Sequence, residues 1–388
     1  MTSTFVILTL CLILSFTVCL GLTKLAYTGG FIKLKFIPAW LTSLIGFVVL
    51  YLSVNITHDQ LHPIPLYEIF TLFGLSGLMC VFSLFEKLDK YTPILNAVSA
   101  TFLSLLVPSD FYLFNGYLPF IADRALIIAL VFIISHCLKY LNNIDGLVGI
   151  QSSFIFFAIF ILYLADAVPF LIGGFAVIML GIAATIAIFS WFPSAIKLSP
   201  AHCNALGLII AWLLLRSSVE DAASCTLIAL MYLLVEIITI FYKAVISRKE
   251  SKPIENLSNA YQTFLSGLSV VNVCISVSKI FIMLSFFCFF QAYAPNEFSI
   301  PAFALVIVVW MINHMLNWQQ PKKTLKEINK DFIEDVKENL QDIKSSLSKD
   351  KTENEAKDEI SPIEEKTEEE HKEEDKKEEY KEEEKKDE

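Results

Sequence analysis

The sequence has 388 residues, 55% of them hydrophobic, and a formal net charge of −10. Up to residue 320 the chain holds 14 basic and 14 acidic residues, whereas the last 68 residues hold 16 basic and 26 acidic ones. A chain with all of its net charge in the last sixth is not one ordinary soluble globule. The pattern also excludes a secreted disulfide scaffold and a nucleic-acid binder with a basic face. We expect a membrane domain over residues 1–320, followed by a solvated tail.

Long apolar stretches follow one another through the first 320 residues. A spanning helix needs about 20 mostly apolar residues, and this length predicts a bundle of about 10–11 spans. The apolar runs are continuous, without the alternation of a barrel wall, so the sequence predicts an all-α, polytopic membrane helix bundle. The fourth and eighth segments are short. The eleven segments cover residues 4–22, 38–56, 65–85, 92–108, 119–138, 147–165, 168–189, 203–216, 222–243, 267–291 and 298–318.

Basic residues favour every second loop between these segments. Because basic loops stay in the cytoplasm, we expect the N-terminus outside and the C-terminus inside, in a protein that crosses the inner (cytoplasmic) membrane many times. No basic stretch precedes the first segment, so we interpret it as a retained helix rather than a signal peptide. The sparse set of loops holds only Arg124 and Arg216, both near helix ends. The rich set holds Lys24, Lys33, Lys35, Lys87, Lys90, Lys139, Lys197, Lys243, Arg248, Lys249 and Lys252.

The densest polar stretch lies on the predicted cytoplasmic side and reads KYLNNIDGLVGI from residue 139 to residue 150. Asn142, Asp145 and Gly149 are spaced to share one face if the preceding helix continues through them. The pair Asp145-Gly146 is also typical of a turn. Two interpretations stay open, a polar loop that joins two helices and a functional site at the membrane edge.

This stretch resembles a signature of the polyprenyl-phosphate sugar-1-phosphate transferases, Asn-x-x-Asp-Gly-x-Asp-Gly-Leu. The family (glycosyltransferase family 4) includes the phospho-MurNAc-pentapeptide translocase and the undecaprenyl-phosphate GlcNAc-1-phosphate transferases. The resemblance implies ten or eleven spans, an outside N-terminus and a cytoplasmic active site. Three further segments fall in family order, EKLDKYTP at residues 86–93, WFPSAIKLSPAHCNALG at 191–207 and PIENLSNAYQTFLSGLS at 253–269.

Most of the family's chemical residues are replaced in this chain. The family's Asp-Asp pair reads Glu86-Lys87, its Gly-Asp-x-Gly-Ser acid reads Pro200, and the second acid of the Asn142 signature reads Val148. Its His-x-His-His motif reads Ser-Asn-Ala-Tyr over residues 258–261. A lysine at position 87 would compete with a divalent ion, although it would suit a phosphate. Family-type catalysis needs Mg²⁺ held by carboxylates, and few of these remain.

The resemblance carries over to a small set of candidate residues. Asp145 and Asn142 are the catalytic candidates. Glu86 and Asp145 are the candidates for a metal pair, which would hold Mg²⁺ if the protein is active; the alternative is that the protein binds no cofactor. The candidates for substrate contact are Lys87, Lys139, Gly146 and Gly149.

Three functions compete. The leading hypothesis is a non-catalytic or strongly divergent family member that binds a lipid-phosphate or regulates a partner. The alternative is an active transferase that moves a sugar-1-phosphate from a UDP-sugar to a polyprenyl phosphate in envelope glycan synthesis. A transporter ranks lowest, suggested by the many spans and by Glu236 and Lys279, which we expect to form an intramembrane ion pair. The sequence names no sugar, lipid or protein partner, and a homodimer stays open.

Other polar residues receive structural interpretations. Arg216 with Glu220 and Asp221 is interpreted as a solvated connection between helices on the outside. His136 and His314 lie within spans and are expected to form hydrogen bonds inside the bundle. The eight cysteines form no Cys-x-x-Cys pair, and most lie in apolar runs, where cysteine behaves as a small hydrophobic residue.

The tail has two predicted parts. Residues 321–347 form an amphipathic segment on the cytoplasmic side, and residues 348–388 are a Glu/Lys-rich stretch that we expect to be disordered. The tail is interpreted either as a solvating extension or as a docking segment for a cytoplasmic protein partner. The apolar stripe of the first part comprises Leu325, Ile328, Phe332, Val336, Leu340, Ile343 and Leu347.

Overall fold

The computed structural model describes most of the first 320 residues. Contacts divide the chain into two units, Met1–Gln320 and Pro321–Glu388. The predicted amphipathic segment and the acidic tail both lie outside the described residues. The structure describes residues 2–28, 37–57, 64–85, 91–108, 111–113, 118–192, 194, 198–246, 258–265, 267–294, 297 and 299–317.

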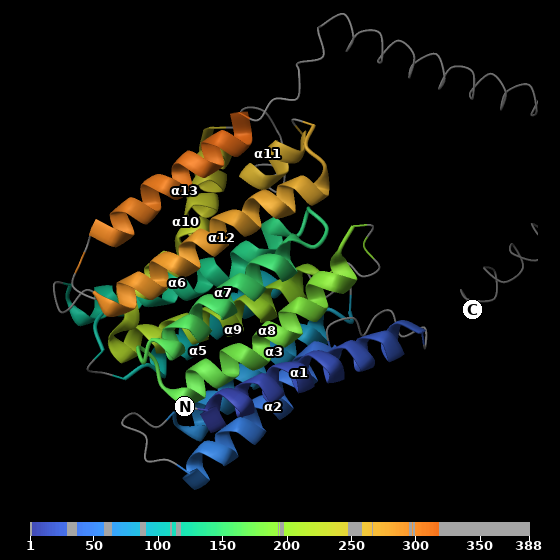
Figure 1. Cartoon of the computed structure of the whole chain (residues 1–388), viewed down its shortest axis with the longest axis vertical. Coiled ribbons are helices and arrows are strands. Elements are labelled where there is room, and N and C mark those ends of the chain that lie inside the picture. The colour runs from blue at the N-terminus through green and yellow to red at the C-terminus, as the bar shows by residue number, and fades with distance from the viewer. Residues whose placement is uncertain are drawn as a thin grey trace, which may run out of the picture. The chain divides into compact units, whose positions relative to one another are not determined.

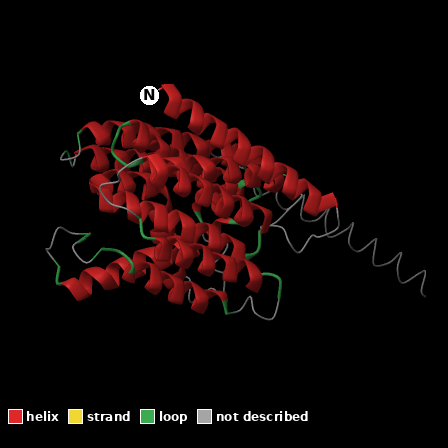
Figure 2. Cartoon of the chain, turned by 90° about the horizontal axis from the view of Figure 1, so that it is seen from below, coloured by secondary structure: helices red, strands yellow, loops and turns green. Residues whose placement is uncertain are grey.

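The described residues form helices joined by turns and contain no strand (Figures 1 and 2). The predicted all-α class is therefore confirmed. The helices are α1 (Thr2–Thr28), α2 (Ile37–Thr57), α3 (Leu66–Phe82), α5 (Thr92–Leu105), α6 (Phe120–Leu141), α7 (Leu147–Leu164), α8 (Phe170–Ser190), α9 (Pro200–Ser217), the π-helical η2 (Ser218–Ala222), α10 (Ala223–Ile246), α11 (Asn259–Leu265), α12 (Val270–Tyr293) and α13 (Ser299–Asn317).

Each of the eleven predicted segments coincides with one of these helices. Within the described residues, eight helices are long and apolar enough to cross a membrane, and three shorter apolar stretches lie in α2, α3 and α5. The fourth segment is short, as expected, because α5 has 14 residues. The eighth is not short, because α9 begins at Pro200 and has 18 residues. Which end of the bundle faces the cytoplasm stays a prediction.

Helices α8 and α9 form the core of the bundle. In their apolar stretches 78% and 89% of the residues are buried, compared with 22% for α1. Small residues let α9 approach its neighbours, since a Cβ atom on Gly207 would lie 2.6 Å from the Ser135 carbonyl oxygen of α6. On another side, the Trp212 ring packs edge-on against Phe47 and Phe175. Helix α9 is therefore the most enclosed of the spanning helices that the structure describes.

The chain reverses direction between α9 and α10 within the π-helical segment η2. The side chains of Ser218 and Thr226 are hydrogen-bonded, with 2.8 Å between their oxygens, although eight residues separate them. In a straight α-helix such residues would lie about 12 Å apart. The π-helical turn thus lets α10 start a new span without a loop.

The end of α5 is held by a single buried arginine. Arg124 of α6 is 8% exposed, and its guanidinium also lies over the Phe120 ring, 5.0 Å from the ring centroid. A helix leaves its last carbonyl groups without intrahelical partners, and Arg124 donates to these and to the turn that follows. The acceptors are the backbone carbonyl oxygens of Ser104, Val107, Pro108 and Phe111.

Candidate functional site

The stretch that resembles the family signature forms a tight turn between two helices. Helix α6 ends at Leu141 and α7 begins at Leu147. Gly146 has φ 81°, a left-handed conformation that glycine adopts without strain. Because the chain turns here, Asn142, Asp145 and Gly149 do not continue one helical face. Of the two interpretations, a loop joining two helices describes the backbone, and any chemistry depends on what the loop contacts.

The turn is joined to the second family-like segment by a hydrogen bond. The Asn142 side-chain amide donates to the Leu198 carbonyl oxygen at 2.7 Å, across 56 residues of sequence. Beside it, a Cβ atom on Gly146 would lie 3.2 Å from the Trp191 ring. Residues 142–146 therefore lie beside Trp191 and Leu198 at one end of the bundle, as the resemblance implies for an active site.

His202 connects this end of the bundle to the C-terminal end of α3. Ser83 Oγ donates to the Cys80 carbonyl oxygen at 2.6 Å, so its single hydrogen is used and His202 Nε2 must donate to Ser83, at 2.7 Å. His202 Nδ1 then accepts from the Ser199 backbone N–H at 3.4 Å, while Ser199 Oγ accepts from the His202 N–H at 3.3 Å. This reciprocal pair is a capping box, and Pro200 occupies the first helical position. Where the family has an acid, this chain starts a helix.

The sequence interpretation missed His202, although a signal was present. A capping box reads Ser or Thr followed three residues later by Glu or Gln, and Ser199 to His202 has the same spacing with an imidazole as acceptor. The pairing with Ser83 had no such signal, because it joins residues 119 apart in sequence.

Asp145 and Lys139 lie at this end as well. Asp145 is partly exposed, and its backbone carbonyl oxygen accepts from Cys274 Sγ at 3.7 Å, which ties the turn to α12. Lys139 is partly buried, with Nζ 5.2 Å from the centroid of the Tyr140 ring, a cation–π contact. Glu86 and Lys87 lie outside the described residues, so their places as metal and substrate candidates stay predictions.

Gly149 has a packing role in the structure. A Cβ atom there would lie 2.5 Å from the Ala187 backbone, so only glycine lets α7 approach α8 this closely. Nothing in the described contacts tests its predicted contact with substrate.

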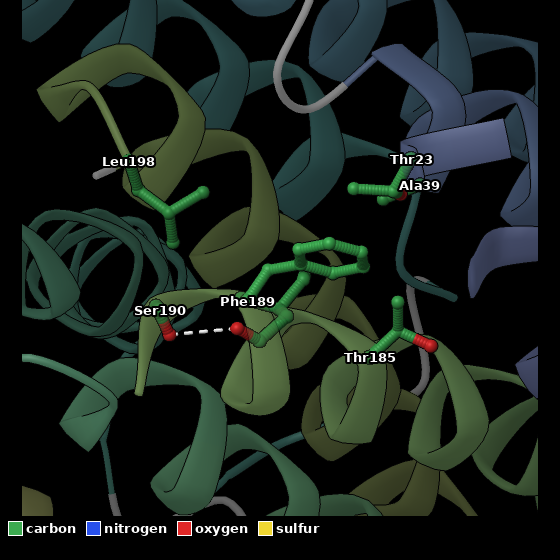
Figure 3. A pocket seen from close by; sticks show the side chains of 7 residues that line it. Thr23, Ala39, Thr185, Phe189, Ser190 and Leu198 are labelled. Carbon is green, nitrogen blue, oxygen red and sulfur yellow. Dashed lines mark hydrogen bonds between the residues drawn. The ribbon is translucent and has the colours of Figure 1, made fainter. Parts of the chain in front are cut away.

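A small cavity lies beside Leu198, at the junction with Asn142. Its volume is about 20 Å³, which is room for about one water molecule. Figure 3 shows the Phe189 ring extending from α8 toward Thr23 and Ala39. The lining residues are Thr23, Ala39, Thr185, Ile186, Phe189, Ser190 and Leu198. A cavity of this size is too small for a nucleotide or for a lipid headgroup.

The predicted ion pair between Glu236 and Lys279 is wrong. Glu236 is 1% exposed, whereas Lys279 is exposed. The Glu236 carboxylate accepts from Tyr232 Oη at 2.8 Å and from the backbone N–H groups of Asn259 at 2.8 Å and Ala260 at 3.3 Å. These are the first residues of α11, in the segment where the family has its histidine motif. The lysine near this carboxylate is Lys243, whose Nζ donates to Asn259 Oδ1 at 3.4 Å, and not Lys279.

The interpretation of Arg216 as solvated is also wrong. Arg216 is 4% exposed and Glu68 2% exposed, and their side chains form a two-point ion pair between α9 and α3. Trp212 Nε1 donates to the same carboxylate at 2.7 Å. This cluster lies near the end of α9, about 24 Å along the helix from Pro200. The sequence carried a signal for it, since Glu68 is a lone carboxylate in an apolar segment.

The remaining polar candidates have structural neighbours. The His136 ring stacks on Phe132, but its buried Nδ1 atom has no hydrogen-bond partner among the described residues, so the hydrogen bond expected for His136 is not found at that atom. The His314 ring stacks on Trp310. All eight cysteines are free thiols, and all but Cys11 are buried. In the part of the chain that the structure describes, no three His, Cys, Asp or Glu side chains are grouped so as to hold a metal ion.

Comparisons with known proteins do not extend these findings. No protein-family model matches the chain, and no curated protein matches it either. The fold and its apolar spans define a helical, multi-pass integral membrane protein.

Proposed function

We propose that this membrane protein is a non-catalytic or strongly divergent relative of the polyprenyl-phosphate sugar-1-phosphate transferases, and that it binds a lipid-linked phosphate. One observation carries the proposal. The Asn142 turn and the family-like segment that contains Leu198 and His202 meet at one end of the bundle through the Asn142–Leu198 hydrogen bond, and His202 is also hydrogen-bonded to Ser83, three residues before the segment that begins at Glu86.

The replaced positions favour binding without catalysis. Pro200, at the position of a family acid, is the first residue of a capped helix and has no side-chain ligand atom. Asn259 and Ala260, at positions of the family's histidine motif, give their backbone N–H groups to Glu236. Both segments are therefore used to start helices.

The residues at the turn suit an anionic ligand better than a metal-dependent reaction. Asp145 is the carboxylate that the described part of the turn offers, and Glu86 is the second candidate. If Mg²⁺ binds, these two would hold it, and the ion would offset the charge of approaching phosphates. Lys139 and Lys87 would supply positive charge to a phosphate without any metal.

An assay of UMP release separates binding from catalysis. The purified full chain in lipid nanodiscs would receive Mg²⁺, undecaprenyl phosphate and a panel of UDP-sugars. We expect no UMP release with any donor. Release that is lost in Asp145→Asn and retained in Asp166→Asn would establish the active transferase instead. Asp166 is a suitable control because it follows the opposite end of α7.

Binding of the lipid is the positive test. We expect the full chain to retain undecaprenyl phosphate in native mass spectrometry, and Lys139→Gln to weaken this binding several-fold through the loss of one charge. Equal retention of undecaprenyl phosphate and undecaprenol would mean that the phosphate is not recognised and would contradict the proposal.

The transporter hypothesis loses support, because Glu236 and Lys279 do not form the ion pair that suggested it. Glu236 is bound by Tyr232 and by α11, and Lys279 is exposed. A regulatory partner bound through the acidic tail remains part of the proposal, because a protein that binds a lipid without converting it must act through another protein. Its test is a pull-down that compares the full chain with one ending at residue 320.

A further inference from the structure

Three buried polar side chains in the core lack hydrogen-bond partners among the described residues. Neither amide atom of Gln151 or of Asn204 is paired, and Ser152 Oγ is also unpaired. All three residues are 0% exposed. Buried polar groups in folded proteins are normally paired with protein or with ordered water, and in a membrane the penalty for leaving them unpaired is larger. These five atoms therefore need a partner.

The contacts of α7 show which way Gln151 faces. Gly149 faces Ala187 of α8, and the Phe154 ring stacks on Phe281 of α12 with centroids 5.9 Å apart. An α-helix turns by about 100° around its axis per residue. Gln151 therefore points about 200° around the α7 axis from Gly149, and about 60° past the direction of Phe154. It thus faces away from α8, and because it is fully buried, its side of α7 is left to the other helices that pack against α7, which include α9 and α10.

The contacts of α9 place Asn204 on the matching side. Gly207 faces Ser135 of α6, and the Trp212 ring contacts Phe175 of α8. Asn204 lies about 60° from Gly207 and about 80° from Trp212, between these two directions. That sector of α9 lies between the sides that face α6 and α8 and is buried, and α7 is among the helices that pack against α9.

The two amides also lie at the same depth. Gln151 and Asn204 are each the fifth residue of their helix, about 6 Å from its start. The Asn142–Leu198 hydrogen bond joins the turns that precede the two helices. Direction and depth together indicate that Gln151 and Asn204 lie at one interface, about one helical turn inside the candidate site.

We propose that Gln151 and Asn204 form an internal hydration site between α7 and α9, which we name the amide seam. Amides need both a donor and an acceptor opposite them, and water supplies both. An ion would satisfy only one half of each amide. The seam is independent of the proposed lipid binding, since it requires neither a phosphate nor a nucleotide.

Cysteine accessibility tests the seam. Gln151→Cys and Asn204→Cys would be made in a chain whose eight native cysteines are replaced by alanine, after this chain is shown to melt like the parent. Ile155→Cys and Leu208→Cys are the matched controls, because each lies one turn deeper on the same face and is 0% exposed. Since thiolates form only where water reaches, we expect the seam thiols to react with a small water-soluble methanethiosulfonate at least about tenfold faster than the controls. Equal, slow labelling at all four positions would overturn the proposal.

A second measurement does not depend on introduced thiols. Gln151→Met and Asn204→Leu keep nearly the same volume but remove the amides. A hydrated seam predicts a lower melting temperature for each variant, because water bound to the remaining polar groups loses a partner. If the amides are instead dry and unpaired, each variant will melt at a higher temperature, which would contradict the seam.

Discussion

Glu68 and Arg216 stabilise the bundle only as a pair, because each alone is a charge enclosed in protein. We expect Glu68→Gln to lower the free energy of unfolding by about 3–5 kcal/mol, since it leaves Arg216 buried without its counter-charge. Thermal unfolding in nanodiscs would measure this. Glu297→Gln serves as the control, because Glu297 is exposed and should change stability little.

The double variant distinguishes an ion pair from two separate contributions. If the two charges act as a unit, Glu68→Leu with Arg216→Leu should unfold at a higher temperature than either single variant, because no uncompensated charge remains. Additive losses would show that each side chain contributes through packing alone.

Gly149 and Gly74 should respond in opposite ways to the same substitution. A Cβ atom on Gly149 would meet the Ala187 backbone at 2.5 Å, whereas nothing lies within 4 Å of one on Gly74. We expect Gly149→Ala to cost about 1–3 kcal/mol of stability through overpacking. Gly74→Ala should add about 0.5–1 kcal/mol, because alanine favours the helix. Similar melting temperatures for the two variants would contradict the close packing of α7 on α8.

At the scale of elements, Glu236 determines whether α11 stays docked. Its carboxylate accepts both backbone N–H groups at the start of α11, and a glutamine would present an NH₂ group to one of them. We expect Glu236→Gln to speed amide hydrogen exchange at Asn259 and Ala260 while exchange in α8 is unchanged. Tyr232→Phe is the control, because it removes one hydrogen bond to the carboxylate and leaves α11 bound.

The helices were predictable from the sequence, whereas their polar contacts mostly were not. Continuous apolar runs define spans because a bilayer sets their length, so all eleven segments were found. Helix α11 was missed because it has seven residues and no apolar run of its own. The reversal at η2 was predicted as a solvated loop, because Arg216, Glu220 and Asp221 are charged.

The site was predictable where residues are neighbours in sequence and not where they are distant. The Asp145-Gly146 turn follows from residue type, since glycine accepts a positive φ. The partner of Asn142 lies 56 residues away and that of Glu68 lies 148 residues away. A single sequence offers no means to pair such positions. The predicted ion pair of Glu236 and Lys279 was wrong for the same reason, because the partners of Glu236 could not be identified from the sequence.

For the whole molecule, the orientation in the membrane is the prediction with the widest consequence. The eleven basic residues in alternate loops predict that the end of the bundle with Asn142 and His202 faces the cytoplasm. An epitope tag at the N-terminus should then be cleaved by protease added to intact cells, and a tag at the C-terminus should be protected. The reverse pattern would place the candidate site outside, away from cytoplasmic UDP-sugars, and would contradict the proposed function.

The arginine that closes α5 has a consequence for the lipid around it. At 14 residues α5 is about 21 Å long, whereas the hydrocarbon core of a bilayer is about 30 Å thick. Non-helical backbone is tolerated at membrane depth only where protein satisfies its carbonyl groups, and Arg124 does this for the turn after α5. The hydrocarbon core can therefore be thinner than its usual thickness beside α5. This hydrophobic mismatch favours thinner or locally compressed membrane on that flank, so acyl-chain length becomes a determinant of where the protein is stable.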